Sequence, residues 1–98
     1  MRELDTQKLD GLVNRMVGDL GACVTGALVV LGDHLGLYKA MAGSDGMTPE
    51  ELAKATGMKE RYLREWLSAQ AASGFVDYDD ETDRFSLNPE QSMVFANE

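Results

Sequence analysis

Residues 47–87 constrain the fold of this chain more than any other stretch. Thr48 opens a helical pattern that ends at Gly57, and a second helical pattern follows it. Phe75, Val76 and Tyr78 then read as a strand, and an acidic turn follows. Residues 84–87 alternate polar and apolar side chains and pair back as a second strand. Helix, tight turn, helix and hairpin, in this order, predict a mainly α fold. They outline a winged helix-turn-helix with a two-stranded β-hairpin wing and additional N-terminal helices.

The helices of residues 47–98 carry clear end signals. Thr48 and Glu51 form a capping box around Pro49, and Gly57 suits the left-handed residue that follows a helix. The next helix opens at Lys59 or Glu60. Its expected apolar face consists of Tyr62, Leu63, Trp66, Leu67, Ala69, Ala71 and Ala72. Asn88-Pro-Glu-Gln91 is a second capping signature, which predicts a last helix running to Glu98.

Residues 1–46 precede this unit and read as helices. The stretch from Asp5 to Val17 has the spacing of an amphipathic helix. Gly18-Asp19 interrupts that pattern, and Asp19 is a suitable N-cap for the next helix. Residues 32–41 continue helically, with bends expected at Gly32 and Gly36.

The helix predicted from Leu20 to Gly32 is apolar nearly all round, so it must be buried on all sides. Its small residues let a second backbone approach closely; they are Gly21, Ala22, Thr25 and Gly26. We expect this helix to form a homodimer, with residues 1–46 as the dimerisation region and 47–98 as the winged helix of the same domain. The alternative is a core helix within one chain. Cys23 is expected to be a small buried residue.

The charge distribution disfavours nucleic acid as a partner. The chain has 9 basic and 17 acidic residues and a net charge of −8, whereas DNA-binding proteins need a basic surface. The wing tip carries Asp79, Asp80, Glu81 and Asp83. The expected recognition helix carries Lys59, Arg61 and Arg64, but its arginines can pair with glutamates, as Glu60–Arg64 and Arg61–Glu65. A dimeric winged-helix DNA-binding transcriptional regulator remains the alternative function.

No catalytic, cofactor-binding or metal-binding set can be assigned. No two of the glycines are separated by a single residue, so a dinucleotide-binding loop is absent, and one cysteine and one histidine cannot form a metal site. His34 and Tyr38, four residues apart, could contact a ligand held elsewhere. The chain starts without a signal peptide, and the apolar run 20–31 is too short to span a bilayer. A cytoplasmic protein with no membrane partner is therefore expected.

The order of these motifs resembles a known family. The segments are Gly26-Ala-Leu-Val-Val-Leu-Gly-Asp-His-Leu-Gly-Leu-Tyr-Lys-Ala-Met41, Met47-Thr-Pro-Glu-Glu-Leu-Ala-Lys-Ala-Thr-Gly57, Arg61-Tyr-Leu-Arg-Glu-Trp-Leu67, Ala71-Ala-Ser-Gly-Phe-Val76 and Phe85-Ser-Leu-Asn-Pro-Glu90. This succession, over residues 20–98, is similar to the N-terminal winged-helix domain of bacterial class I S-adenosylmethionine-dependent methyltransferases.

The resemblance implies a dimerising domain that caps the substrate pocket of a catalytic domain in cis. S-adenosylmethionine is then the cofactor of the full-length protein and has no site in this chain, which lacks the catalytic domain. Asp33, His34, Leu37 and Tyr38 match a helix that lies toward the substrate pocket in such enzymes. The chain is accordingly expected to be a fragment of a longer enzyme or a stand-alone relative. A module that only binds other proteins is a further alternative.

Overall fold

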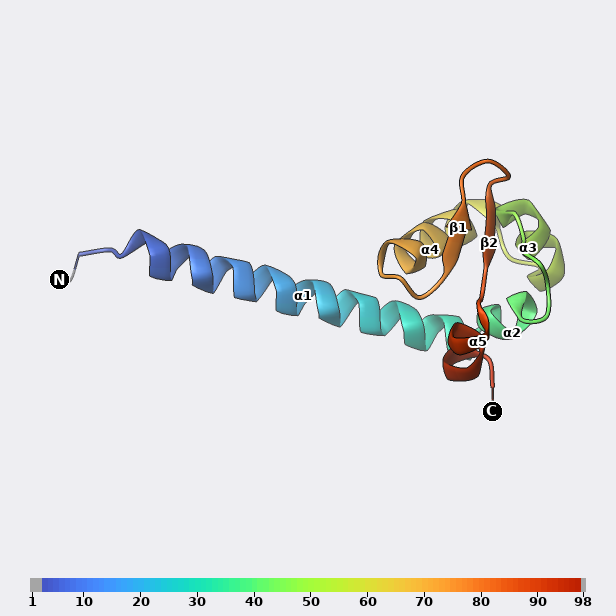
Figure 1. Cartoon of the computed structure of the whole chain (residues 1–98), viewed down its shortest axis with the longest axis horizontal. Helices are drawn as coiled ribbons and strands as arrows, with labels where there is room; N and C mark the ends of the chain where they lie inside the picture. The colour runs from blue at the N-terminus through green and yellow to red at the C-terminus, as the bar shows by residue number, and fades with distance from the viewer. Residues whose placement is uncertain (1–2, 98) are drawn as a thin grey trace.

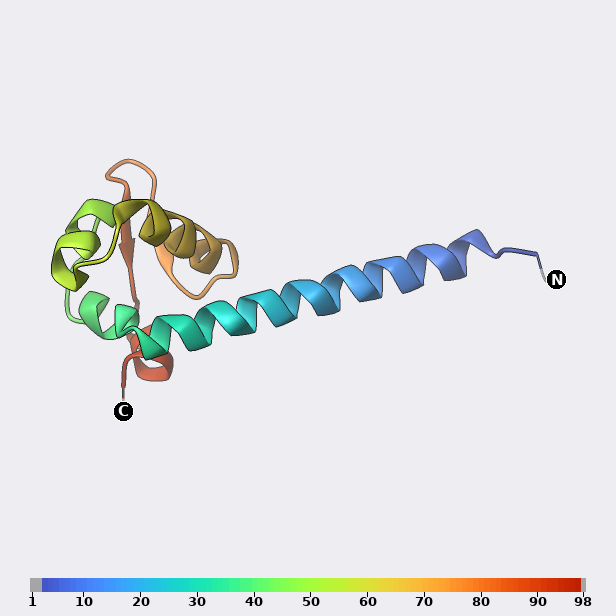
Figure 2. The same cartoon turned by 180° about the vertical axis from the view of Figure 1, so that it is seen from behind.

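One long helix and a compact helical body make up the molecule, whose computed structural model describes residues 3–97. Helix α1 (Thr6–His34) projects from the body that the rest of the chain forms (Figure 1). The same projection is visible from behind (Figure 2). The molecule measures 60 × 30 × 23 Å, with a radius of gyration of 17.3 Å. A compact chain of this length has a radius of about 13 Å, so α1 sets the overall dimensions.

Helix α1 is continuous over 29 residues, and the predicted interruption at Gly18-Asp19 is wrong. The N-cap is Asp5, whose side chain accepts from the backbone N–H groups of Gln7 and Lys8. A glycine inside a helix costs only about 1 kcal/mol relative to alanine, and no proline or left-handed residue accompanies Gly18 to end the helix. The apolar spacing also continues across this point, so the two predicted helices are one.

The chain turns after α1 at a single glycine. Gly36 has φ 72° and precedes the short helix α2 (Leu37–Met41), whereas the helix runs through Gly32 without ending there. One of the two predicted bends is therefore confirmed. Because Gly36 separates the helices, His34 and Tyr38 do not share the face of one helix, and that part of the sequence argument is wrong.

Helices α3 (Pro49–Thr56) and α4 (Glu60–Ala72) form the helix-turn-helix. Both sides of the predicted capping box are present: Thr48 Oγ1 accepts from the Glu51 N–H at 3.1 Å, and Glu51 Oε1 accepts from the Thr48 N–H at 2.9 Å. Gly57 ends α3 with φ 73°, as predicted. The first residue of α4 is Glu60, after Lys59 as N-cap.

The wing is the antiparallel pair β1 (Asp77–Asp79) and β2 (Arg84–Ser86), which pairs Tyr78 with Phe85. It confirms the predicted hairpin, although β1 begins two residues later than the sequence pattern indicated. Phe85 also exchanges two backbone hydrogen bonds of 2.8 Å with Met47, which ties the wing to the segment before α3.

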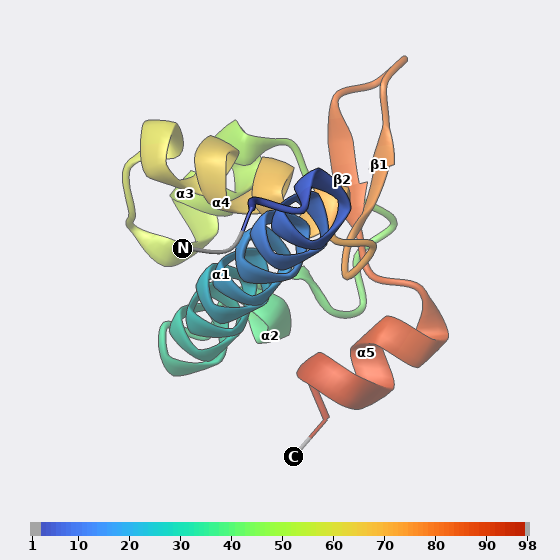
Figure 3. The ribbon, with the colours of Figure 1, turned by 90° about the vertical axis from the view of Figure 1, so that its left-hand side faces the viewer.

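The last helix, α5 (Pro89–Phe95), starts with the predicted capping box between Asn88 and Gln91. It ends before Ala96, so the prediction that it continues to Glu98 is wrong, and Glu98 itself lies outside the described residues. Figure 3, which looks along α1, shows the α3–α4 pair, the wing and α5 arranged around the end of that helix.

The buried core joins α2, α3, α4 and the wing. Its members are Leu37, Tyr38, Met41, Leu52, Leu63, Trp66, Leu67, Val76 and Phe85. The Tyr38 hydroxyl donates to Gln70 Oε1, and the Tyr38 ring packs edge-on against Trp66 with ring centroids 5.0 Å apart. The Trp66 indole N–H donates to the Leu28 carbonyl at 2.9 Å and so fixes α4 to the end of α1.

Most of α1 is exposed in the single chain. Of its 29 residues, all of them described, only Gly32 is buried, and every residue from Thr6 to Val24 is exposed. The alternative of a core helix within one chain is therefore wrong. Cys23 is exposed too, contrary to the prediction, because nothing in the same chain covers α1 at this position.

Candidate functional site

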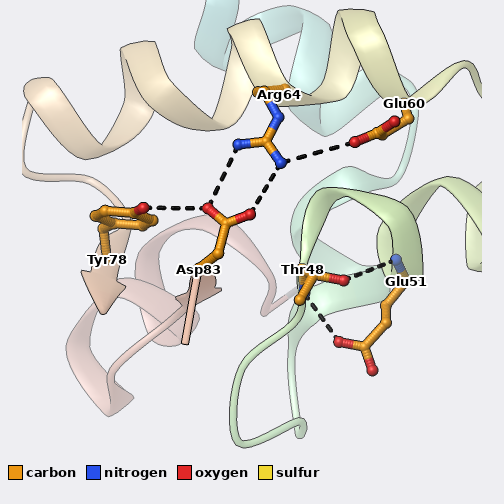
Figure 4. A network of polar contacts seen from close by, with 6 residues as sticks. All are labelled: Thr48, Glu51, Glu60, Arg64, Tyr78 and Asp83. Atoms are coloured by element: carbon orange, nitrogen blue, oxygen red, sulfur yellow. Dashed lines mark hydrogen bonds and ion pairs between the residues drawn. The ribbon is translucent and has the colours of Figure 1, made fainter. Parts of the chain in front are cut away.

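An ion-pair network occupies the face that would contact DNA in a DNA-binding winged helix (Figure 4). Arg64 of α4 contacts Asp83, the last turn residue before β2, with its two terminal nitrogens 3.4 and 2.9 Å from the two carboxylate oxygens. The second nitrogen also lies 3.7 Å from Glu60, one helical turn earlier. The Tyr78 hydroxyl donates to Asp83 at 3.1 Å from the other strand.

This network perturbs the protonation of its members. The hydrogen bond from Arg64 lowers the pKa of Asp83, and the same bond raises the pKa of Arg64. Tyr78 has a raised pKa because its hydroxyl donates to the Asp83 carboxylate. Asp83 adopts φ 55°, a left-handed conformation that aspartate tolerates better than most residues, so the turn itself presents this carboxylate.

Few basic groups remain on this face. Lys59 and Arg61 are exposed, and Arg61 makes no ion pair with Glu65 in the described part of the chain, so one of the two predicted pairs is wrong. The exposed acids Asp79, Asp80 and Glu81 surround the network at the wing tip. A phosphate backbone would meet more negative than positive charge here.

The local sequence pattern does not predict the contact between Arg64 and Asp83, because it indicates only a Glu60–Arg64 pair and an acidic turn that contains Asp83. The two residues are 19 positions apart, and only the folded wing brings them together. The sequence feature that could have indicated this contact is an aspartate at the last position of the hairpin turn, together with an arginine on the preceding helix.

The four residues predicted to face a substrate pocket separate into two pairs. Asp33 and His34 lie exposed at the end of α1, whereas Leu37 and Tyr38 are only 1% exposed in the core. Burial, and to a smaller extent the charge of Asp33, raises the pKa of Tyr38 to about 12. The Tyr38 ring stacks on Phe95 of α5, with centroids 4.8 Å apart and planes 19° from parallel.

Phe95 lines an open groove of about 570 Å³ between α1, α5 and the segment after α4, which we call the α1–α5 groove. Its lining residues are Ala22, Thr25, Gly26, Val29, Ser73, Phe75 and Phe95. Of the small residues of α1, Ala22, Thr25 and Gly26 line this groove. The groove has the size and apolar character of a small-molecule site, with hydroxyl groups from Thr25 and Ser73.

Two further observations concern metal binding and a possible membrane span. Among residues 3–97, no group of three or more His, Cys, Asp or Glu side chains is placed to hold a metal ion. Helix α1 is long and apolar enough to cross a membrane by length and composition alone, with a mean hydropathy of 1.5 over its most apolar window. Because α1 begins well before Leu20, the short apolar run 20–31 does not by itself exclude a membrane span. An apolar helix that pairs with another protein passes the same test.

Comparisons with known proteins agree with this geometry. The family described as the Rv2258c-like winged HTH domain matches residues 22–97. Twelve chains of solved structures match, among them CalO1, described as a methyltransferase in calicheamicin biosynthesis in its SAH-bound form.

CalO1 is 25% identical to this chain with a TM-score of 0.67, and the match covers 98% of this chain and 27% of CalO1. The chain thus spans about a quarter of the length of that methyltransferase. No curated protein sequence matches it. The matched segment contains the helix-turn-helix and the wing whose geometry is described above. This chain therefore belongs to the Rv2258c-like winged HTH domain family.

Proposed function

We propose that this chain is the dimerisation and substrate-capping winged-helix domain of an S-adenosylmethionine-dependent methyltransferase, and that it is not catalytic by itself. The catalytic domain, with the cofactor, would lie in cis in the full-length protein, in the cytoplasm. The likeness to an SAH-bound methyltransferase supports the enzyme class. The observation that carries the domain's role is the exposed apolar surface of α1.

The energetics of that surface support the proposed dimerisation. Large apolar side chains such as Leu12, Leu20 and Val24 are 60 to 65% exposed, on a helix that contacts the body only near its end. A projecting helix of this kind has little stability of its own in water, since helices in proteins are held mainly by packing. A second copy of α1 supplies the missing packing.

Capping is supported by the α1–α5 groove. Its wall is apolar, its volume suits a small molecule, and it is open on one side, as a roof over a site in another domain would be. Tyr38 lies behind Phe95 in this wall, so of the predicted pocket residues Tyr38 would act by positioning Phe95 rather than by touching a substrate. Asp33 and His34 remain proposed contacts at the exposed end of α1.

A DNA-binding regulator is the second candidate, because the family is described as a winged HTH domain. It would need Arg64 to leave Asp83 and the wing to approach phosphates despite its acids. A gel shift at low salt tests it, with the wild-type chain and with the Asp83→Ala variant, in which Arg64 loses its contact with the wing. We expect no shift from either protein. A salt-sensitive shift lost on Arg61→Ala would support the regulator instead.

The main experiment has two parts. Light scattering of this chain should give the mass of a dimer, and Leu20→Asp should give a monomer. Val94→Asp serves as the matched control, because Val94 is similarly exposed but lies on α5. Calorimetry with S-adenosylhomocysteine should show no binding to this chain and binding to the longer native protein. A monomeric wild-type chain, or a native protein no longer than this chain, would contradict the proposal.

A further inference from the structure

Helix α5 carries the most exposed apolar side chains of the body. From Leu35 to Asn97, the exposed large apolar residues are Leu35, Tyr62, Tyr78, Met93 and Val94. Met93 and Val94 are 65 and 71% exposed, whereas the other three are 41 to 58% exposed. Pro89 and Glu90 of the same helix are exposed beside them. We call these four residues of α5 (Pro89, Glu90, Met93 and Val94) the α5 outer face.

The other helices of the body expose charged residues instead. The exposed sides of α3 and α4 include Glu50, Lys54, Glu60 and Arg64. The outer side of a surface helix is usually polar in this way, so an apolar outer side indicates that another surface covers it. The only charged residue of the α5 outer face is Glu90, in the first turn of the helix.

The surface is hollowed on both sides of Met93. The four residues of the α5 outer face line an open hollow of about 470 Å³. A second hollow of about 310 Å³ is lined by Ala42, Pro89, Ser92, Met93, Ala96 and Asn97. Met93 and Pro89 belong to both hollows and form a ridge between them. Methionine is flexible and adapts to irregular contacts, so this ridge suits packing against another protein surface.

The opposite side of α5 is fixed to the body. Gln91 Nε2 donates to the Asp77 carboxylate at 3.1 Å. The Phe95 ring packs on both Tyr38 and Phe75, with ring centroids 4.8 and 5.2 Å apart. Phe95 also lines the α1–α5 groove. A partner seated on the outer face would therefore be held in a defined position relative to that groove.

We propose that the α5 outer face is the surface against which the catalytic domain of the full-length protein packs, with Met93 as the central contact. This inference rests on the proposed function, which includes a catalytic domain in cis, and it adds the surface through which the two domains touch. The match to CalO1 covers 27% of that methyltransferase, so most of it lies outside the part that resembles this chain. A polypeptide continuing after Asn97 would leave the body beside α5 (Figure 1).

The size of this face favours a tethered domain over a second copy of the chain. Met93 and Val94 together expose roughly 250 Å², about a third of the ~800 Å² that each partner contributes to a standard interface between separate proteins. Interfaces between domains of one chain start at about 600 Å² in total, or about 300 Å² on each side. A smaller contact is sufficient there because the linker keeps the effective concentration of the second domain high.

Oxidation of Met93 by hydrogen peroxide tests this contact, because the peroxide must reach the thioether sulfur. It transfers one oxygen atom to the sulfur and leaves water, so that methionine becomes methionine sulfoxide. Mass spectrometry follows the rate at Met93 in this chain and in the longer native protein. We expect Met93 to react at least tenfold more slowly in the longer protein. Met16, which is 53% exposed on α1, is the internal reference, and its rate should change less than twofold.

The outcomes separate this inference from the proposed function. A native protein no longer than this chain would overturn both. Equal rates at Met93 in this chain and in a longer native protein that binds S-adenosylhomocysteine would overturn the inference alone. Slow oxidation of Met93 in this chain that speeds up on dilution would show that a second copy covers the face, and it would also overturn the inference.

A charge introduced on the face gives a second test. In the longer protein, Val94→Asp should bring the oxidation rate of Met93 to within about twofold of its rate in this chain, because burying an unpaired carboxylate is costly. Tyr62→Asp is the matched control and should leave Met93 protected. Tyr62 lies on α4 and is 58% exposed, contrary to its prediction in the apolar face of that helix. Continued protection of Met93 in Val94→Asp would contradict packing of the second domain on this face.

Discussion

Gly32, where α1 packs against the body, has no room for a side chain. A Cβ atom added at Gly32 would lie 2.3 Å from Trp66 Cζ2 and 2.8 Å from Tyr38 Cε2. Neither ring can move freely. Trp66 is held by its hydrogen bond to the Leu28 carbonyl, and Tyr38 by its bond to Gln70 and its stacking on Phe95. We therefore predict that Gly32→Ala destabilises the protein.

Two opposing terms set the size of the effect. Replacing a helical glycine by alanine contributes up to about 1 kcal/mol of stability. Overpacking in a filled core costs about 1–3 kcal/mol, and contacts this short with anchored rings place Gly32→Ala at or above the upper end. A net loss of about 2 kcal/mol lowers the melting temperature of a domain of this size by roughly 8–16 °C.

Urea unfolding followed by circular dichroism measures this loss of stability directly. One fixed protein concentration is used, because the stability of the proposed dimer would depend on concentration. Gly18→Ala is the matched control: it lies in the same helix with no atom within 4 Å of the added Cβ, so it should be as stable as the wild type or more stable. If the Gly32→Ala variant were as stable to urea as the Gly18→Ala variant, the tight packing of Trp66 against α1 would be refuted.

Three further predictions concern polar contacts. Asp83→Asn should remove the stability that the ion pair with Arg64 contributes. In the wild type this contribution is complete above the unfolded pKa of the Asp83 carboxyl and is lost as pH falls through its lowered folded pKa. Urea unfolding of both proteins at pH 7 and below pH 4 should therefore show a difference in stability at pH 7 that shrinks in acid. Thr48→Ala removes the cap of α3 and should cost about 1 kcal/mol in the same assay, with Glu51→Gln, which keeps an acceptor, costing less. Because the pKa of Tyr38 is raised to about 12, its contribution to stability should be complete below pH 10 and decline as pH rises toward 12, and Tyr38→Phe should abolish this part of the alkaline loss.

The sequence predicted the winged helix well because its signals are local. The capping boxes at Thr48 and Asn88 each occupy four consecutive residues, and Gly57 needs only its own backbone conformation to end α3. Periodicity identified Leu63, Trp66 and Leu67 as core residues for the same reason, since one face of one helix is enough to define them.

The errors concern features that local signals do not determine. Gly18 and Asp19 looked like a boundary because both residues favour helix ends, but a continuing apolar stripe outweighs that preference. Burial of Cys23 could not be judged from the sequence, since an apolar residue on a projecting helix has no neighbour in its own chain. The predicted pocket residues share a short segment, yet Gly36 turns the chain between them, and Leu37 and Tyr38 enter the core.

Five of the chain's glycines lie within α1, at positions 11, 18, 21, 26 and 32. Each lowers helix propensity by up to about 1 kcal/mol relative to alanine, so the projecting half of α1 in an isolated chain is poorly suited to stay helical. If the partner supplies the packing, formation of this helix and association of the two chains become a single coupled transition. The protein would then reach its native shape at a rate that depends on how often two chains meet. Newly made chains at low abundance would spend longer with α1 unfolded and accessible to proteases. A different chain whose helix did not pack well against α1 could not keep α1 helical and would dissociate.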